Sequence, residues 1–323
     1  MGNGAVHLTV RSYRDEDMGD LDYLRRAVAA VDRTADGIAV MEPPADPAST
    51  TAEPHKDAHV ITDGAGRILG MAQLQVMMGP DKGFIWAFPT LYPDRRGTGA
   101  ERLLLERLWK RASELGRQAR SKRVHFYVHC ASHQAQRITL YEDLGWRPLL
   151  HRPHMIYQPL TDLARPDVPP GIEVRPYERG EDDASALRTL NEAFADDWEY
   201  TPATQDHWSA WLDNPHWRPE LNLVAADGDE VVGMCLALVI EERIRWLGRR
   251  DGYVDTLCVR PSHRRKGLAT ALLLSGLQAL KSEGMHSATL DTDEDNPTEA
   301  PRFYESIGFR EIWRWIAYGR ELS

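Results

Sequence analysis

Apolar and polar positions follow a regular order in the second half of the chain. A short apolar run at residues 254–259 has the character of a buried strand, which Pro261 ends. Leucines then recur at helical spacing as far as Gly284, and a second short apolar run covers residues 287–292. The leucines are Leu268, Leu272, Leu273, Leu277 and Leu280. The pattern therefore predicts a strand, a turn, an amphipathic helix and a second strand.

The turn before this helix is rich in basic and small residues. Arg264, Gly267 and Ala269 fit the pattern Arg-x-x-Gly-x-Ala at the mouth of the helix. Because Gly267 has no side chain and Ala269 almost none, the backbone can approach a phosphate while successive N–H groups point at it. The pattern by itself is equally typical of an ordinary strand–helix connection with a basic edge.

Further motifs follow the turn in a fixed order. Residues 296–300 read Asn-Pro-Thr-Glu-Ala, and Phe303-Tyr304-Glu305 precede Gly308-Phe309. With residues 264–269, these motifs resemble the GNAT superfamily of acyl-CoA N-acyltransferases over about residues 172–320. The resemblance implies an α/β (α+β) fold, with a mixed, mostly antiparallel central sheet, two splayed parallel strands and flanking helices.

The first half carries a weaker copy of the pattern. Residues 91–99 parallel 259–267, and residues 140–146, Leu-Tyr-Glu-Asp-Leu-Gly-Trp, match 303–309. Between them lie a helical leucine pattern that we expect to stop at Gly116 and a strand-like run at 124–129. A repeat of this length indicates two copies of one domain, and therefore two tandem GNAT folds.

A proline-rich stretch separates the copies. Residues 157–175 lack apolar periodicity, which is typical of a linker. We expect an N-terminal GNAT-like domain at 1–160, a linker at 161–171 and a catalytic domain at 172–323. Each domain has about 160 residues, enough for its own core. Residues 42–57, rich in Pro, Ala, Ser and Thr, are expected to form a mobile loop.

Composition narrows the classes of function. The 323 residues are 42% hydrophobic, which is typical of a globular chain, and no apolar run approaches the roughly 20 residues of a membrane span. A net charge of −10 argues against general nucleic-acid binding and is compatible with a cationic small substrate. Three cysteines and an N-terminus without a signal-peptide profile favour a cytoplasmic protein without disulfides. We expect a monomer, built as an internal pseudo-dimer, or a homodimer.

The resemblance implies acetyl transfer from acetyl-CoA to a primary amine of a small molecule by direct attack. A main-chain N–H near Val259 would bind the thioester oxygen, and the helix mouth would hold the pyrophosphate. Asn296 would bind the cofactor or shape its loop, although a plain Asn-Pro turn explains it equally well. The cofactor contacts implied are Leu257, Cys258, Val259, Arg264, Arg265, Lys266, Gly267, Leu268, Ala269, Thr270 and Asn296.

Two side chains are candidates for proton transfer. Tyr304 matches the tyrosine with which the family commonly protonates the departing thiolate, and a phenol of pKa ~10 suits that role; the alternative is a core tyrosine. Asp255 is the candidate base, acting through a water, or else a structural or substrate-binding carboxylate. Asp251 and Tyr253 are lesser candidates.

Strand alternation predicts the face of the sheet on which Asp255 lies. It places this carboxylate on the face of Leu257 and Val259, opposite Val254, Thr256 and Cys258. Cys258 is expected to be a small buried packing group. A covalent acyl-enzyme on this thiol is not expected, because no His–acid pair lies at a recognisable spacing from it.

The acceptor side is only outlined by the sequence. Residues 191–217 contain four tryptophans, Trp198, Trp208, Trp211 and Trp217, and the acids Asp196, Asp197 and Glu199. These residues either hold a cation together, or the tryptophans belong to the core and the acids to the surface. The acids of 291–295 either attract a polycationic acceptor or form a solvated loop. Acetylation of a cysteinyl amine on a thiol-sugar, acetylation of proteins or peptides, and acyl-CoA sensing without turnover remain alternatives.

The first copy departs from the family pattern. Glu101 stands where Ala269 stands in the second copy, and His133 stands in the place of Asn296, whereas Tyr141 keeps the tyrosine position. A carboxylate at 101 would repel a pyrophosphate unless it points away, so we expect the first domain to be degenerate and non-catalytic. No metal site is expected, since the strand spacing of His125, His129 and His133 spreads their rings too far apart.

Overall fold

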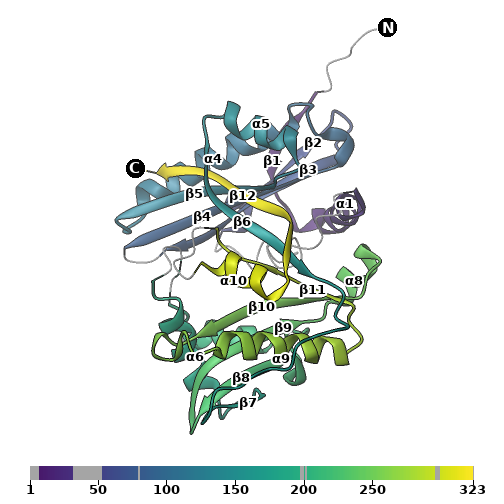
Figure 1. Ribbon diagram of the computed structural model, residues 1–323. Helices are drawn as coiled ribbons and strands as arrows, with labels where there is room; N and C mark the ends of the chain where they lie inside the picture. Colours follow the sequence, from purple (N-terminus) through teal and green to yellow (C-terminus); the bar gives the residue numbers. More distant parts are fainter. Residues whose placement is uncertain are drawn as a thin grey trace. The chain divides into compact units, whose positions relative to one another are not determined.

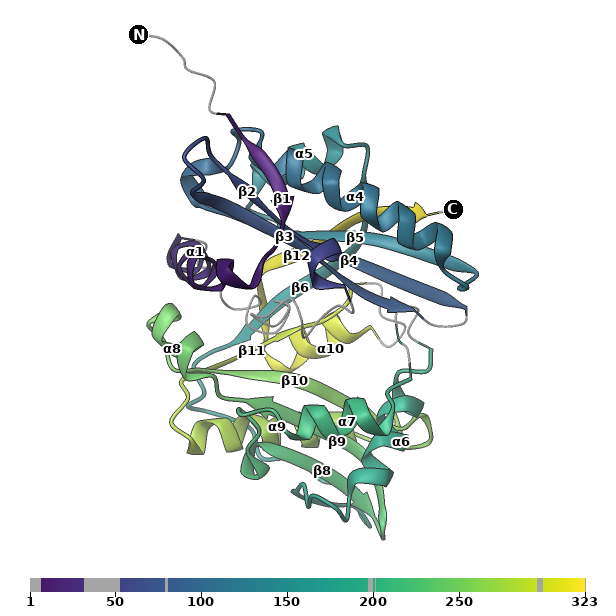
Figure 2. The same ribbon diagram turned by 180° about the vertical axis from the view of Figure 1, so that it is seen from behind.

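The chain forms two compact units. The computed structural model describes residues 7–31, 53–78, 81–196, 200, 202–294 and 299–322. Unit 1 is made of Met1–His151 and Trp313–Ser323, and unit 2 is made of Arg152–Ile312. Both are mixed α/β structures in which helices cover a mostly antiparallel sheet (Figures 1 and 2). This is the fold class that the motifs imply.

Unit 1 has the strand order β1-β2-β3-β4-β5-β12, with β4 and β5 parallel and the other neighbours antiparallel. Its strands are β1 (Thr9–Ser12), β2 (Ala58–Thr62), β3 (Ile68–Met78), β4 (Lys82–Leu91), β5 (Arg123–Ala131) and most of β12 (Arg310–Leu322). Its helices are α1 (Met18–Val31), α3 (Pro54–Asp57), α4 (Ala100–Gln118) and α5 (Ala135–Asp143). Leu104 and Leu108 of α4 pack into one core, and Leu21 of α1 packs into another.

Unit 2 repeats this plan with the order β6-β11-β10-β9-β8-β7, in which β10 and β11 are parallel. Its strands are the end of β6 (Arg147–Tyr157), β7 (Glu173–Pro176), β8 (Asn222–Asp227), β9 (Glu230–Leu238), β10 (Asp251–Val259) and β11 (Ser287–Asp291). Its helices are α6 (Asp183–Ala193), α7 (Gln205–Leu212), α8 (Glu241–Leu247), α9 (Leu268–Ser282) and α10 (Ala300–Ile307). The core under α9 contains Leu272 and Leu277, and a separate core holds Ala186 of α6 and Trp208 of α7.

Each unit takes one strand from the other half of the sequence. The end of β12 pairs with β5, from Trp315↔Ala131 to Leu322↔Val124. The end of β6 pairs with β11, from Ala288↔Tyr157 to Asp291↔His154. The domain limits expected from the linker, 1–160 and 172–323, stay a prediction, and the compact units differ from them at these two strands. Strand pairing, which linker composition does not encode, accounts for the difference.

Two local expectations change in the structure. Helix α4 does not stop at Gly116 but continues to Gln118. The glycine serves a close approach instead, because a Cβ at Gly116 would lie 3.0 Å from the Cβ of Leu322 on β12. Of the loop expected at 42–57, residues 54–57 form the single-turn helix α3, and 42–52 lie outside the described residues.

The residues expected to form the linker pack along helix α9. Leu160 is buried in the core beneath that helix. The Lys281 ammonium donates a hydrogen bond of 2.6 Å to the carbonyl of Thr161, and the Gln278 amide donates one of 3.3 Å to the carbonyl of Ala164. The segment is thus irregular in backbone but fixed in place by unit 2.

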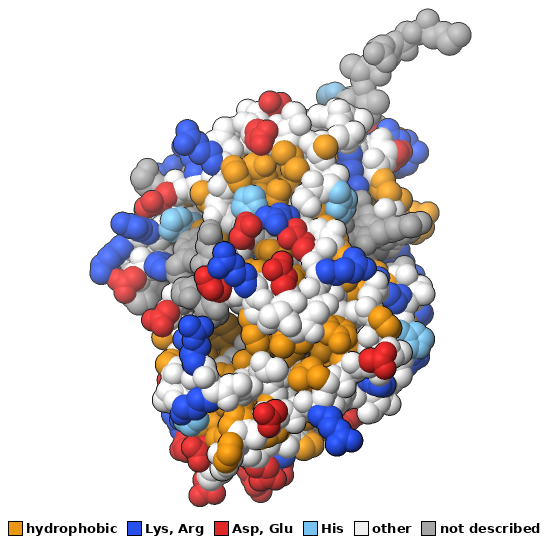
Figure 3. Space-filling model, in the orientation of Figure 1, with side chains coloured by type: hydrophobic (Ala, Val, Ile, Leu, Met, Phe, Trp, Pro, Cys, Tyr) orange, Lys and Arg blue, Asp and Glu red, His pale blue; other side chains and the backbone are white. Residues whose placement is uncertain are grey.

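The surface carries charges of both signs. On the face shown in Figure 3, basic and acidic side chains are interspersed without a continuous field of one sign. None of the helices in the described part of the chain is long and apolar enough to cross a membrane.

A buried ion pair joins the beginnings of β10 and β11. Arg243 of α8 donates a 2.7 Å hydrogen bond to Asp251 of β10, and both side chains are almost completely buried. Ser287 and Thr289 of β11 also donate to Asp251, and Arg243 donates to Thr289. This network, which we call the strand pin, cross-links the two parallel strands at one end. Arg249, which is partly exposed, lies farther from Asp251, at 3.4 Å. Removing Arg243 therefore leaves the buried charge of Asp251 with only this more distant partner.

We expect Arg243→Met to destabilise unit 2 by about 3–5 kcal/mol, because Asp251 keeps its charge in a buried site. The control is Arg302→Met, which removes the partner of Glu299 from an exposed pair with side chains 78% and 70% accessible; it should cost under about 1 kcal/mol. Urea unfolding measures both free energies. Equal values for the two variants would contradict the role of the strand pin.

Candidate active site

The central feature of unit 2 is a fork between two parallel strands. Strands β10 and β11 pair only at Asp251↔Ser287, Gly252↔Ala288 and Tyr253↔Thr289. Beyond these residues β10 continues to Val259 against β9 alone, and β11 continues to Asp291 against β6 alone. The two strands therefore part, and main-chain groups that would have joined them are left for another partner.

The direction of the free N–H groups follows from one main-chain hydrogen bond at the end of β10. Arg260 N–H donates to the carbonyl of Val232 on β9, at 2.9 Å. Since successive residues of a strand point alternately to its two edges, Cys258 also faces β9, and the N–H groups of Leu257 and Val259 face the fork. The fork thus has two adjacent donors on one strand, and the main chain of Cys258 is used in the sheet.

A β-bulge lies at the point where the strands part. The pairing of β10 with β9 shifts between Val254 and Thr256, so Asp255 is the extra residue. The expected alternation is consequently wrong: Val254 packs in the same core as Leu257, and the hydroxyl of Thr256 donates to Asp255 at 3.0 Å. The bulge turns two neighbouring side chains to one side and exposes part of the carboxylate.

The surroundings of Asp255 change its acidity. Desolvation disfavours the charged carboxylate and raises its pKa above the ordinary value, and the hydrogen bond from Thr256 partly offsets this effect. A carboxylate with a raised pKa is a better proton acceptor than an exposed one at neutral pH. This position is compatible with the base expected from the sequence.

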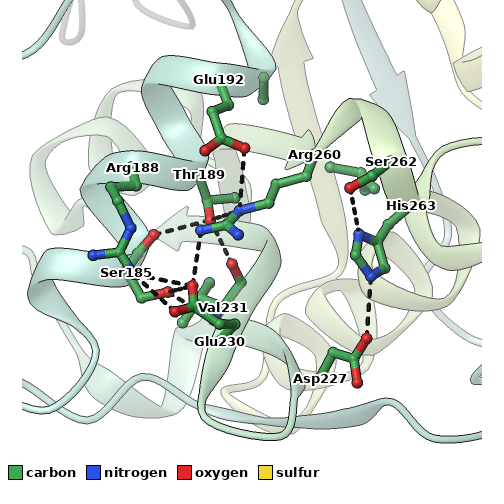
Figure 4. Close-up of polar contacts among 12 residues, drawn as sticks. Ser185, Arg188, Thr189, Glu192, Asp227, Glu230, Val231, Arg260, Ser262 and His263 are labelled. Atoms are coloured by element: carbon green, nitrogen blue, oxygen red, sulfur yellow. Dashed lines mark hydrogen bonds and ion pairs between the residues drawn. The ribbon is translucent and has the colours of Figure 1, made fainter.

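Two side chains of the basic turn after β10, Arg260 and His263, anchor it to neighbouring elements (Figure 4). Arg260 donates to Thr189 of α6 at 2.9 Å and to Glu230 of β9 at 3.1 Å. His263 contacts Asp227 of β8 at 3.2 Å through Nε2. These contacts tie the turn to α6 and to the β8–β9 hairpin, so the backbone of the turn is fixed before any ligand binds.

Arg264 also serves as an anchor. Its guanidinium donates to the carbonyl of Val259 at 3.1 Å and to the carbonyl of Ala193, at the end of α6, at 2.7 Å. The side chain that begins the Arg-x-x-Gly-x-Ala pattern is therefore turned toward the protein. It links the end of β10 to α6.

The next residues of the turn face solvent. Arg265 and Lys266 are exposed, and Arg265 has the left-handed backbone conformation, with φ of 64°. The corresponding residue of unit 1 is Gly97, with φ of 72°, which adopts this conformation without strain. An arginine in this conformation costs roughly 1 kcal/mol or more relative to glycine.

Helix α9 begins without a side-chain cap. Gly267 occupies the N-cap in the left-handed conformation, with φ of 82°, and no heavy atom lies within 4 Å of the place its Cβ would take. Leu268, Ala269 and Thr270 form the first turn, where N–H groups have no partner within the helix. An open helix N-terminus beside Arg265 and Lys266 is suited to bind phosphate. The described residues thus fit the pyrophosphate of acetyl-CoA.

Tyr304 lies on α10 in the core that also contains Leu257 and Leu268. The side chain is 8% exposed and contacts the rings of Phe303 and Phe309 at centroid distances of 5.2 and 5.7 Å. Burial raises its pKa well above the ordinary value, so the hydroxyl keeps its proton. Among the described residues, no group accepts a hydrogen bond from this hydroxyl. The proton is thus available to a ligand.

A polar group that sequence reasoning missed lies beyond the paired part of the fork. Asp291, at the end of β11, accepts a 2.9 Å hydrogen bond from Tyr253 and has a 2.9 Å contact with Nδ1 of His154. The sequence pointed to Tyr253 as a lesser candidate base and to Asp291 as one of the acids of 291–295, but not to a contact between them. His154 comes from β6, in the other half of the sequence, and no pattern in the chain connects it to this site.

The tryptophans expected near the acceptor pack against one another. Trp208 is buried, and its ring stacks on Trp211 at 5.2 Å, while Trp211 meets Trp217 edge-on at 4.6 Å. All three belong to the core of α6 and α7. The structure therefore favours the core interpretation over a cation site. The fourth tryptophan, residue 198, and two of the acids expected beside it, residues 197 and 199, lie outside the described residues, as does Asn296.

The residue of unit 1 that corresponds to Ala269 is Glu101, which takes part in an ion pair. Glu101 turns inward and contacts Arg137 at 2.8 Å, and both side chains are largely buried. Arg137 also donates to the carbonyl of Pro89 on β4, at 3.1 Å. Pro89 corresponds to Leu257 in the repeat and lacks an N–H, so one of the two fork donors is missing. Within the described residues, no group of three metal-binding side chains occurs in either unit.

The sequence is similar to known acetyltransferases. Residues 187–309 match the model of the Acetyltransferase (GNAT) family. The mycothiol acetyltransferase of Streptomyces griseus subsp. griseus is 31% identical over 261 residues, which are 79% of this chain and 78% of that protein. The mycothiol acetyltransferase of Rhodococcus jostii is 30% identical over 277 residues, which are 81% and 82% of the two chains.

Solved structures share the fold. A GCN5-related N-acetyltransferase from Sphaerobacter thermophilus has a TM-score of 0.70 and 22% identity, covering 98% of this chain and 96% of that one. A tandem GNAT protein from the clavulanic acid biosynthesis pathway has a TM-score of 0.67 and 17% identity, covering 98% and 99%. At these identities the likeness concerns the fold.

We expect the three cysteines to resist alkylation in the folded protein. Cys130, Cys235 and Cys258 are buried, and burial raises the pKa of each thiol to about 12. At pH 8 about one thiol in 10,000 would then be ionised, so iodoacetamide should label them only after unfolding. Mass spectrometry with and without urea measures the labelling. Rapid labelling of native Cys258 would reopen a covalent acyl-enzyme.

Proposed function

Because the chain belongs to the GNAT acetyltransferase family, we propose that unit 2 transfers the acetyl group of acetyl-CoA to a primary amine of a small molecule by direct attack. The observation that carries this proposal is the fork between β10 and β11, which lies in the same unit as the open N-terminus of α9. The fork offers free main-chain donors, and the helix offers a phosphate site.

In the proposed reaction, the residues of unit 2 bind the thioester oxygen and transfer protons. Acetyl-CoA supplies a thioester whose carbonyl carbon the amine attacks, after which the C–S bond breaks. The N–H groups of Leu257 and Val259 bind the carbonyl oxygen as negative charge develops on it. Asp255 accepts the proton that the amine loses, through a water, and Tyr304 gives its proton to the departing thiolate. The proton of the amine and the proton of the thiol are thereby both accounted for.

The turn and helix α9 hold the cosubstrate. The first N–H groups of α9, together with Arg265 and Lys266, would bind the pyrophosphate, while Arg264 keeps the turn in place. Glu101 and Pro89 support a non-catalytic unit 1, because Glu101 puts a carboxylate at the position of Ala269 and Pro89 lacks the N–H that Leu257 has in unit 2. A cytoplasmic location and a monomeric or homodimeric state complete the proposal.

One acceptor class has particular support. The relatives that cover more than three quarters of the chain are named mycothiol acetyltransferases, which favours the cysteinyl amine of a thiol-sugar as a second, more specific candidate. Tyr253 stands eight residues before Pro261, where we align a glutamate base in mycothiol synthase, so the base would differ here. Amino-sugar and peptide amines are the competing acceptors.

Release of free thiol from acetyl-CoA tests the function. We expect release that requires an amine, and a decrease in kcat of about 10²-fold or more for Tyr304→Phe, because the thiolate loses its proton donor. The panel includes glucosamine, spermidine, S-methyl-L-cysteine amide and a short peptide.

Tyr141→Phe is the matched control, since Tyr141 holds the same position in unit 1. It should leave kcat within about 3-fold of the wild type. An equal loss in both variants would contradict catalysis by unit 2. Tight acetyl-CoA binding without release for any amine would favour a sensor instead.

We also expect Asp255→Asn to lose activity while gaining stability at pH 7. The raised pKa in the folded state means that the protonated form is favoured by folding, so ionisation above the unfolded pKa of about 4 destabilises the protein as pH rises through the folded pKa. The neutral asparagine avoids this cost. The gain in melting temperature should be present at pH 7 and shrink as pH falls toward 4.

Calorimetry at the two pH values measures the effect. Asp229→Asn, at an exposed position in the β8–β9 turn, is the control and should show little pH-dependent difference. A loss of stability in Asp255→Asn at pH 7 would indicate a structural carboxylate rather than a base.

A further inference from the structure

Two carboxylates flank the point where β10 and β11 part. Asp255 and Asp291 each lie two residues beyond the last paired residues, Tyr253 and Thr289. They come from different strands, and the hydroxyl of Tyr253, at the last pairing of β10 with β11, donates a 2.9 Å hydrogen bond to Asp291. The fork is therefore lined by one carboxylate on each arm.

Asp291 is held rigidly. Tyr253, which is 5% exposed, donates to its Oδ2, and His154, which is completely buried, contacts its Oδ1. Each carboxylate oxygen can accept a second hydrogen bond, so both remain able to bind a further donor. A carboxylate fixed by two buried donors loses little conformational entropy when it binds a ligand.

The neighbouring acids are neutralised, whereas these two are not fully compensated. Asp251 pairs with Arg243 at 2.7 Å, and Asp293 pairs with Arg152 at 2.6 Å. Among the described residues, Asp255 has no ion pair, and the ion-pair partner of Asp291 is a histidine. The fork therefore carries an excess of negative charge in a partly desolvated place, and such a place favours a cationic ligand.

We propose that Asp291 binds the ammonium group of the acceptor and holds it at the fork, next to Asp255. The inference rests on the proposed function and deepens it, because it assigns acceptor recognition to one carboxylate and proton removal to the other. Tyr253 is a positioning residue that acts through Asp291. The acceptor is thus a primary amine that arrives as its cation. It gives one proton to Asp255 through a water before it attacks, and the second proton, which the nitrogen loses after attack, replaces the one that Tyr304 has given to the thiolate.

The two carboxylates predict different kinetic changes. Asp291→Asn should raise KM for the amine by about 10- to 100-fold, because one charge-assisted hydrogen bond to the ammonium is lost. KM for acetyl-CoA should stay within about 2-fold of the wild-type value. The acidic limb of the kcat–pH profile, which reports Asp255, should persist. Tyr253→Phe should raise the amine KM by a smaller factor, because Asp291 keeps its contact with His154.

Asp293→Asn is the matched control. It removes the same charge from the same segment, but Asp293 is already paired with Arg152. We expect its amine KM to change by less than about 3-fold. Equal effects of the two variants, or an equal rise of both KM values in Asp291→Asn, would overturn the assignment and indicate a structural role.

A second measurement separates this inference from the proposed function. Calorimetric titration of S-methyl-L-cysteine amide and glucosamine into the CoA-bound protein needs no turnover. Weaker amine binding in Asp291→Asn than in Asp293→Asn supports the inference even if no acetylation occurs. Acetylation by the wild type with unchanged amine binding in Asp291→Asn would leave the function intact and overturn the inference. Absence of amine binding to the wild type would overturn it as well.

Discussion

The end of hydrogen bonding between β10 and β11 after Tyr253 and Thr289 is the constraint on which the rest of unit 2 depends. Parallel strands ordinarily satisfy each other's main chain, so parting them leaves donors and acceptors without partners. The strand pin of Arg243 and Asp251 holds one end of the pair together, and the bulge at Asp255 diverts the other. A ligand that restores the missing hydrogen bonds therefore gains free energy there.

Basic side chains of the turn after β10 have two different roles: some fix the backbone of the turn, and others remain exposed. Arg260, His263 and Arg264 are used to fix the backbone, while Arg265 and Lys266 remain at the surface. An anchored turn presents its N–H groups without a large entropic cost on binding. Arg265 has a left-handed backbone conformation that strains an arginine but places a positive charge beside the helix N-terminus. In unit 1, which binds no phosphate in the proposed function, a glycine has this conformation.

The two units illustrate how one fold keeps or loses a site. Their strand order and helix positions correspond, and both α4 and α9 begin at a left-handed glycine without a side-chain cap. Unit 1 differs in having Glu101, paired with Arg137, at the position of Ala269, and in having Pro89 at the position of Leu257. In unit 2, Asp255 has no ion pair among the described residues, and the ion-pair partner of Asp291 is a histidine. Uncompensated charge costs stability, and proteins retain such costs mainly where they serve function.

The sequence by itself determined the repeat, the fold class, the basic turn and the place of Tyr304, because these depend on local periodicity and on motifs a few residues long. It did not determine the face of Asp255, since a bulge reverses alternation without a signature in the chain. The meeting of His154, Tyr253 and Asp291, and the exchange of β6 and β12, were decided only by tertiary structure. Pairing between distant strands depends on register and burial, which no single segment contains.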